Sequence, residues 1–325
     1  RGVQLSNRVF IFFFQIFFTI VLERGRNKLT EVKAMAVPPF ALNLGPLTES
    51  ILDLSRVQLR ETPELREKSI RELRQLLHEA TDLHYRDDDD FLLIFLRPCH
   101  FYPESAIKMM RRIAEFKKNH NALLKHVMPD DEKSAFEDHN IVNVLTNLDH
   151  KGRRVLIVNC GAPWDPKIVN SDKLFRIFYL VHLAAQLEVA TQIRGVVVIM
   201  DFEGLSMKQI KALSPAFSKR LLTFIQEAMP LRLKEVHIIK QPYLFKMVWA
   251  FFKPFIQEKL GKRMHFHGGD MKSLHKFMDP DYLPSNYGGN LPAINYGGKD
   301  WFPCIMEHVD HIEKWNSYGY ANAIP

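Results

Sequence analysis

The sequence predicts an α/β fold with a mostly parallel sheet, and two observations support this. Residues 196–200 (VVVIM) form a short apolar run rich in β-branched side chains, which is typical of a strand buried on both faces in the middle of a sheet. Residues 169–192 before it and 208–228 after it carry apolar side chains at helical spacing. Strands that alternate with helices indicate parallel strands joined by right-handed crossovers.

Composition limits the class of protein without deciding its function. The 325 residues are 46% hydrophobic and 25% charged, as in an ordinary globular protein of one large or two modest domains. The net charge of +7 permits attraction to anionic lipid or nucleic acid and requires neither. Cys99, Cys160 and Cys304 are few and widely spaced, which argues against a disulfide framework and favours the reducing cytoplasm.

The first residues differ from the rest of the chain. Residues 9–22 (VFIFFFQIFFTIVL) are apolar, but this run is shorter than the roughly twenty residues that span a bilayer. No small-residue cleavage site follows it, and the first methionine is Met35. We expect residues 1–34 to be an upstream or hydrophobic leader segment outside the fold. A signal or membrane anchor is the alternative.

Residues 35–128 are expected to form a small helical domain. Thr62 and Pro63 are an N-cap residue and a first-turn proline, and they predict a helix over Glu64–Glu79. Three more helices are predicted at Thr48–Ser55, Phe91–Leu96 and Pro103–Asn119. The segment Pro129–Asp131 marks the boundary with the next domain.

Residues 129–295 are expected to form the α/β domain, followed by a tail over 296–325 in which Trp301 and Trp315 offer surface for packing. A hairpin is predicted from Ile141–Asn147 and Val155–Cys160, and a further strand from Val236–Ile239. Tyr243–Phe252 (YLFKMVWAFF) has apolar side chains on nearly every face of its predicted helix. Such a helix must be covered on two sides or must itself cover something.

Several motifs occur in an order that resembles a known family. They are FLLIFLRP, the WDP turn at Trp164–Pro166, DFEG, MPLRLKEVHIIKQP, FKPFIQEKLGKRMHFHG and LPSNYGG. From about Thr62 to Gly289 the chain resembles the CRAL-TRIO (Sec14-like) family, in the branch that holds tocopherol-transfer, retinaldehyde-binding and clavesin proteins. The resemblance implies a small helical domain followed by an α/β domain that holds one lipophilic ligand. It also implies that Tyr243–Phe252 is a mobile lid.

Resemblance to the tocopherol carriers also implies which residues form the ligand pocket. Phe178 and His182 replace small hydroxyl residues of those carriers, which argues against tocopherol itself. His182 could serve as the partner of a ligand hydroxyl or carbonyl; a histidine without ligand contact is the alternative, as plain core is for each apolar residue. The expected wall consists of Phe175, Phe178, His182, Val196, Val198, Leu221, Phe224, Ile225 and Leu231, with Phe245, Val248 and Phe251 from the lid.

Basic residues fall into two one-sided groups. Arg232 and Lys234 alternate along an extended segment, while Lys259 and Arg263 share a helical face with Lys262. In the tocopherol carriers the positions that match Arg232, Lys234, Lys259 and Arg263 bind phosphoinositide headgroups, so the resemblance implies such a site here. Cys99 replaces one further basic residue of those carriers, although Arg97 persists nearby. A solvated charged face is the alternative.

Other kinds of site are weakly supported. Asp201–Gly204 resembles the DxDG motif of aspartyl-phosphate phosphatases, but Glu203 replaces its second aspartate, so both acids are expected to fix the turn after the strand. His265 with His267, and His308 with His311, could each face a metal but lack a third ligand. We therefore predict no catalytic residue, cofactor or metal. Nucleic acid is not expected as a partner, because no basic stripe is interleaved with aromatic residues.

The sequence thus favours a non-enzymatic, cytoplasmic carrier of one hydrophobic ligand of the tocopherol, retinoid or carotenoid type. We expect it to exchange that ligand during transient association with endosomal or other phosphoinositide-bearing membranes. The alternative is a phosphoinositide-dependent endosomal trafficking adaptor in which the pocket is secondary. A hydrolase is the third possibility, and it requires activity that depends on Asp201.

Overall fold

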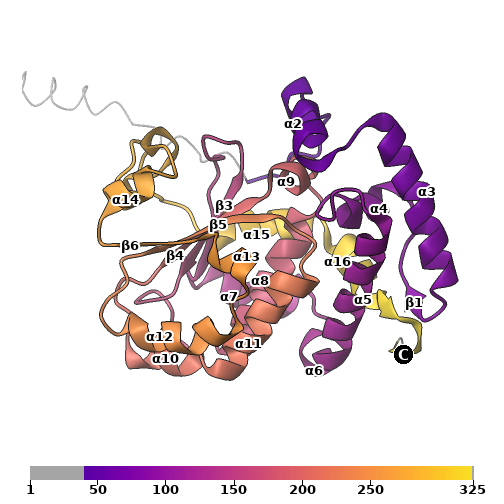
Figure 1. The fold of residues 1–325 in the computed structure, drawn as a ribbon. Helices are drawn as coiled ribbons and strands as arrows, with labels where there is room; N and C mark the ends of the chain where they lie inside the picture. The colour runs from indigo at the N-terminus through magenta and orange to yellow at the C-terminus, as the bar shows by residue number, and fades with distance from the viewer. Residues whose placement is uncertain (1–39, 324–325) are drawn as a thin grey trace, which may run out of the picture. The chain divides into compact units, whose positions relative to one another are not determined.

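The computed structural model describes residues 40–323, so the predicted leader segment lies outside the described residues. At the centre is a five-stranded sheet in the order β2-β3-β4-β5-β6 (Figure 1). β2 and β3 are antiparallel, as the predicted hairpin requires, and the other neighbours are parallel. The strands are β2 Val142–Val144, β3 Arg154–Asn159, β4 Val196–Asp201, β5 Leu233–Ile239 and β6 Met264–Gly268. The predicted α/β class with β4 in the middle of the sheet is confirmed.

The two faces of the sheet are covered differently, and β4 shows how. Val197 and Ile199 point to one face and join a buried cluster with Leu274 of α14. Val196 and Val198 point to the other face, because successive strand residues alternate between faces. The second face is covered by α8 Ser171–Ala185, α11 Pro215–Thr223, α12 Phe245–Phe252 and α15 Gly298–Met306. On the first face α14 is Met271–His275, followed by η4 Pro280–Tyr282 and η5 Ser285–Tyr287.

Two helices that were predicted as continuous are broken. The segment 169–192 forms α8 and α9 Val189–Arg194, with Glu188 between them turned toward Arg154. The segment 208–228 forms α10 Met207–Ala212, α11 and the π-helical turn η2 Phe224–Ala228. Ser214 caps α11 by accepting a hydrogen bond from the backbone N–H of Phe217, and Pro215 lacks the N–H needed to continue α10. These predictions of single long helices were wrong.

The N-terminal helices follow their sequence signals closely. The side chain of Thr62 accepts a hydrogen bond from the backbone N–H of Leu65 at 3.2 Å, and that of Asp88 accepts one from Phe91 at 3.2 Å. All residues of the run Phe91–Leu96 are buried. The helices are α2 Glu49–Leu59, α3 Pro63–Glu79, α4 Asp89–Leu96, α5 Pro103–Asn119 and α6 Asn121–Leu124. The buried side chains of these helices belong to one apolar cluster that also includes residues on the face of the sheet covered by α8. The domain boundary near residue 128 stays a prediction.

The C-terminal tail packs against both parts of the described chain. Its elements are α15, α16 Val309–Ser317 and β7 Gly319–Tyr320, which pairs with β1 Leu83–His84. Trp315 stacks on Phe95 with ring centroids 6.1 Å apart. The Lys117 ammonium of α5 donates to the backbone carbonyls of Trp315 at 2.6 Å and Asn316 at 3.1 Å. The last turn of α16 is therefore capped by a residue almost two hundred positions earlier.

The remaining elements connect these parts. They are η1 Pro129–Glu132, α7 Lys133–Glu137, η3 Lys253–Phe255, α13 Glu258–Gly261 and η6 Ala321–Ala323. Within residues 40–323, every helix is too short or too polar to traverse a bilayer.

Candidate ligand cavity and basic cluster

A cavity of about 200 Å³ lies between the sheet and the helices of its second face. Measured in the same way, a void that holds one water needs roughly 10–15 Å³, so this space is far larger than a packing defect. Val196, Val198 and Met200 of β4 line its floor, and the rest of the wall is almost entirely apolar. The cavity can therefore hold a hydrophobic molecule of substantial size.

Helix α12 covers one end of the cavity. Phe245 and Val248 are buried and line it, whereas Tyr243, just before the helix, is 81% exposed. The ring of Phe245 packs edge-on against Phe202, which directly follows β4, with ring centroids 4.7 Å apart. The predicted lid segment thus lies at the carboxyl end of β4. Its apolar side chains have the cavity beneath them, which explains why so many faces of this short helix are apolar.

Nine of the twelve residues predicted to form the pocket wall line this cavity, and three do not. Phe175 and Phe224 lie deeper, where both rings pack against Phe116 of α5. Phe251 of α12 is half-buried outside the lining. The nine are Phe178, His182, Val196, Val198, Leu221, Ile225, Leu231, Phe245 and Val248. Ligand contact by any of the twelve stays a prediction.

His182 is a polar group in this apolar wall. Its side chain is 4% exposed, and neither ring nitrogen has a hydrogen-bond partner among the described residues. The Tyr179 carbonyl is near the ring but outside hydrogen-bond geometry. Burial lowers the pKa of His182 to about 3, so the imidazole is neutral at physiological pH. A neutral imidazole offers one N–H donor and one acceptor to a ligand.

The opposite end of the cavity is closed by residues that the sequence analysis did not identify. Phe40 and Leu42 line it together with Arg154 and Glu188, and we call residues 40–43 the strap. Arg154 and Glu188 form a two-pronged ion pair with Nε–Oε2 at 3.0 Å and Nη2–Oε1 at 2.7 Å. Arg154 begins β3 opposite Val196, the first residue of β4, so the strap lies at the amino ends of these strands.

Three contacts hold the strap on this ion pair. The backbone N–H of Asn43 donates to Glu188 Oε1 at 2.8 Å, and Arg154 Nη2 donates to the carbonyl oxygen of Ala41 at 3.2 Å. The ring of Phe40 lies 4.9 Å from the Arg154 guanidinium carbon. No sequence pattern connects residues 40–43, 154 and 188, because the contacts form only in the folded chain. The same holds for Trp301, Cys304 and Ile305 of α15, which also line the cavity.

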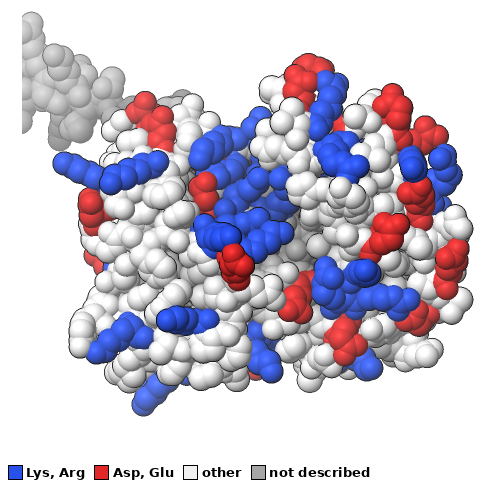
Figure 2. Space-filling model, viewed as in Figure 1, with Lys and Arg blue, Asp and Glu red and all other residues white. Residues whose placement is uncertain are grey.

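Four cations converge on the molecular surface near β5 and α13. Figure 2 shows Lys and Arg side chains gathered over this region. The set comprises Arg232, Lys234, Lys259 and Arg263, which we call the basic cluster. Arg232 Nη2 and Lys234 Nζ both donate to Gln58 Oε1 of α2 at 3.2 Å, and within residues 40–323 no carboxylate forms an ion pair with any of the four. The two one-sided groups predicted from the sequence thus meet.

The electrostatics of the basic cluster show that its charges are close together. Burial and the neighbouring charges of Arg232 and Arg263 lower the pKa of Lys234 to about 8. The pKa of His100 is also lowered, first by burial and then by the charges of Arg232 and Lys259. Lys262, by contrast, pairs with Glu258 at 2.6 Å. Cations held together without a carboxylate favour binding of an anion with several oxygens, such as a phosphorylated headgroup.

Several of the acidic and histidine residues considered in the sequence are engaged in other contacts. Asp201 accepts a hydrogen bond from the backbone N–H of Glu203 at 2.9 Å and pairs with Lys240 at 3.1 Å, so it fixes the turn after β4 as expected. His267 Nε2 lies 3.0 Å from His237 Nδ1, and His311 Nε2 lies 2.8 Å from Gln186 Nε2. Neither predicted histidine pair gathers a third metal ligand within the part of the chain that the structure describes.

The comparisons with known proteins identify the family. Residues 138–289 match the model of the CRAL/TRIO domain. Clavesin-2 of Homo sapiens is 29% identical over 280 residues, covering 85% of this chain and 84% of that protein. Clavesin-1 of Mus musculus is 30% identical over 254 residues, covering 77% and 71%, and clavesin-2 of the same species is 30% identical over 279 residues, covering 84% of each.

A solved structure is also similar, although more distantly. The crystal structure of Sfh5 aligns at 17% identity with a TM-score of 0.42, covering 76% of this chain and 89% of that one. The match to the domain model and the 30% identity to clavesins over most of their length agree with the motifs of the sequence. The chain therefore belongs to the CRAL-TRIO family of lipid-binding proteins.

Proposed function

We propose that this protein is a non-enzymatic carrier that binds one hydrophobic molecule in its cavity. The observation that carries the proposal is the apolar space of about 200 Å³ closed by α12 at one end and the strap at the other. Each Å² of apolar ligand surface removed from water contributes about 25 cal/mol, so an enclosed ligand can bind tightly without any charge. Membership of a lipid-binding family supports the same function.

His182 narrows the chemistry of the ligand. An apolar body with one hydroxyl or carbonyl group would fill the cavity and give the buried imidazole the hydrogen-bond partner that it lacks. A buried hydrogen-bonding group that is left without a partner costs roughly 1–3 kcal/mol. We therefore favour an isoprenoid of the tocopherol, retinoid or carotenoid type.

The basic cluster supports exchange at a membrane that displays phosphoinositides. A headgroup bound by Arg232, Lys234, Lys259 and Arg263 would hold the carrier at the bilayer surface while α12 opens and presents its apolar face to the lipid. Binding that favours the open form shifts the population toward ligand exchange. The protein would then work in the cytoplasm and associate with such membranes transiently.

The alternative is a phosphoinositide-dependent trafficking adaptor in which the cavity is secondary. The observation that favours it is that the basic cluster lies on the surface, where a headgroup could bind without the lid moving. Native mass spectrometry of the purified protein, followed by organic extraction, separates the two functions. A stoichiometric isoprenoid supports the carrier, whereas an empty cavity or a phospholipid favours the adaptor.

Charge reversal tests the membrane step. The double variant Lys259→Glu/Arg263→Glu should bind phosphoinositide vesicles at least about tenfold more weakly, because each cation near an anionic surface contributes about 1 kcal/mol. The cavity ligand should stay bound. The matched control is Lys262→Glu on the same segment, since Lys262 is already paired with Glu258 and should change binding much less. Vesicle flotation that is equal for the double variant and the wild type would remove the membrane step.

A further inference from the structure

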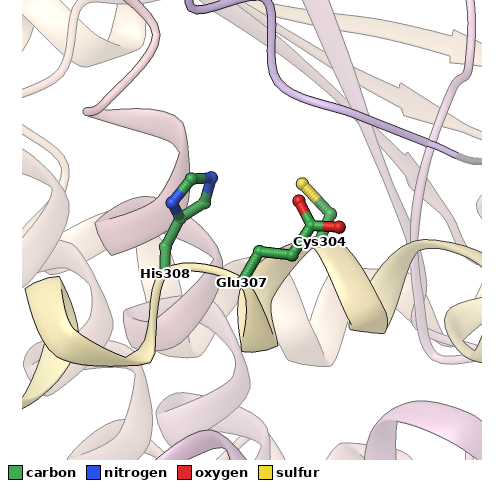
Figure 3. Close-up of side chains that lie close together, drawn as sticks. All are labelled: Cys304, Glu307 and His308. Carbon is green, nitrogen blue, oxygen red and sulfur yellow. The ribbon is translucent and has the colours of Figure 1, made fainter.

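Three potential metal ligands converge where α15 ends. Cys304 lies in the last turn of α15, and Glu307 and His308 follow in the junction with α16. One ligand atom from each residue lies within 4.8 Å of the others. Figure 3 shows the three side chains projecting from the same side of this junction. Cys304 lies at the end of α15 and the other two residues lie in the turn that follows, so the local backbone brings the three groups together.

These groups are not engaged in other strong contacts. Among residues 40–323, neither the Glu307 carboxylate nor the His308 imidazole has a hydrogen bond or ion pair. The Cys304 thiol is buried in the cavity wall, where the Leu42 backbone N–H of the strap lies near the sulfur. His311, one turn further along, differs because its imidazole contacts Gln186.

We propose that Cys304, Glu307 and His308 form a binding site for a divalent cation of the zinc class, with water as the fourth ligand. Thiolate sulfur, imidazole nitrogen and carboxylate oxygen are the three donor types that zinc takes, at about 2.0–2.3 Å from the metal. Three protein ligands and one open position form a tetrahedral site. The three ligand atoms already lie within 4.8 Å of one another, and binding a metal requires them to move closer together.

The charges around the sulfur are compatible with a cation. Glu188 and Arg154 lie nearby but pair with each other, so Glu307 is the carboxylate that remains to balance a metal. Burial, together with Glu307, raises the pKa of the Cys304 thiol, and the Leu42 N–H and Arg154 act against this. Zinc binds the thiolate form of cysteine, so a metal bound here would replace the thiol proton.

This site would link metal binding to the end of the cavity that the strap closes. Cys304 lines the cavity and its sulfur faces the backbone of the strap. A cation held by Cys304, Glu307 and His308 would fix the end of α15 to the start of α16 at the place where the strap closes.

Cobalt and zinc titrations of the full chain, prepared without a histidine tag, test the proposal. One Co²⁺ per chain should bind with a sulfur-to-cobalt charge-transfer absorption, and Zn²⁺ should displace it. Cys304→Ala should abolish that absorption. His308→Gln and Glu307→Gln should each weaken Co²⁺ binding by at least about tenfold, since even residues that only support metal ligands are worth 10–100-fold.

Two control variants make the test specific. Cys99→Ala removes another thiol, and Glu313→Gln removes another exposed carboxylate on α16, so both should leave Co²⁺ binding unchanged. Circular dichroism shows whether each variant is folded, and Glu307 and His308 are accessible enough for substitution without loss of the core. Co²⁺ binding that is absent in the wild type, or that persists in both Cys304→Ala and His308→Gln, would overturn the proposal.

Discussion

His182 shows how a single residue can set the chemistry of an apolar cavity. A buried imidazole without a hydrogen-bond partner lowers the stability of the empty protein, because its polar atoms have lost water and gained nothing in return. The same imidazole can give a ligand hydroxyl or carbonyl a partner that hydrocarbon walls cannot offer. If the proposed function holds, the residue gives up stability of the free protein and gains discrimination between ligands.

Replacing this imidazole should separate the two effects. His182→Leu should raise the free energy of unfolding of the ligand-free protein by about 1–3 kcal/mol, measured by urea denaturation. It should also weaken binding of an isoprenoid alcohol relative to the matching hydrocarbon. Phe178→Leu, another cavity-wall substitution without a polar atom, should affect both ligands alike. Equal loss for both ligands in His182→Leu would show that the imidazole makes no ligand hydrogen bond.

Single residues of the site were predictable from the sequence to different degrees. The resemblance placed Phe175, Phe178 and His182 together in the expected wall, and all three lie on α8, but only Phe178 and His182 line the cavity. The resemblance could not show that Phe175 turns away to pack on Phe116, because that depends on where α5 lies. The basic cluster was easier, since alternation along β5 and spacing near α13 already put each pair of cations on one side.

At the scale of elements, the strap and α12 close the cavity by different means. α12 closes it with apolar side chains at the carboxyl end of β4. The strap closes the other end through hydrogen bonds to the ion pair of Arg154 and Glu188, both largely buried. A buried ion pair depends on both partners, because removing one leaves the other charge without compensation. The strap should thus be sensitive to single substitutions in this pair.

Single and double substitutions of the pair test this. Arg154→Met should lower the free energy of unfolding by about 3–5 kcal/mol, because Glu188 is left buried and charged. The double variant Arg154→Met/Glu188→Met should recover most of that loss, as measured by urea denaturation. Both variants should release a bound fluorescent lipid faster than the wild type. The strap loses the hydrogen-bond donor Arg154 in both variants, and it also loses the acceptor Glu188 in the double variant. A double variant no more stable than Arg154→Met would contradict this account.

Elements with strong local signals were predicted well, and those fixed by distant contacts were not. Thr62 and Pro63 located the start of α3, and the apolar run at 196–200 located β4. Ser214 and Pro215 are an N-cap residue and a first-turn proline, which is a local signal for the start of α11. The helical spacing of apolar residues across 208–228 indicated one continuous helix instead, so this start was missed. The strap and α15 carry no comparable pattern, because their role in the cavity comes from packing against residues more than a hundred positions away.

At the scale of the whole molecule, three histidines are shielded from water: His182 and His267 are buried, and His311 is partly buried. His182 lies in the cavity wall. His267 of β6 contacts His237 of β5, and His311 of α16 contacts Gln186. Burial is the main reason that their pKa values fall to about 3, 4 and 4 respectively. In the folded chain all three are thus neutral at pH 6, whereas in the unfolded chain they begin to bind protons below about pH 6.5.

The free energy of unfolding should therefore decrease as the pH falls from about 6.5 to 4.5. Each such imidazole contributes up to about 1.4 kcal/mol per pH unit, because the unfolded state binds one more proton than the folded state. Arg154 lowers the pKa of Glu188, although burial acts in the opposite direction. Protonation of Glu188 in the unfolded chain therefore adds to the loss of stability only below about pH 4.5, which is the ordinary pKa of this carboxyl group. Urea denaturation across this pH range measures the slope. His311→Gln should reduce it by about one imidazole's contribution. A free energy of unfolding that stays constant over this range would show that these imidazoles become protonated without loss of the fold.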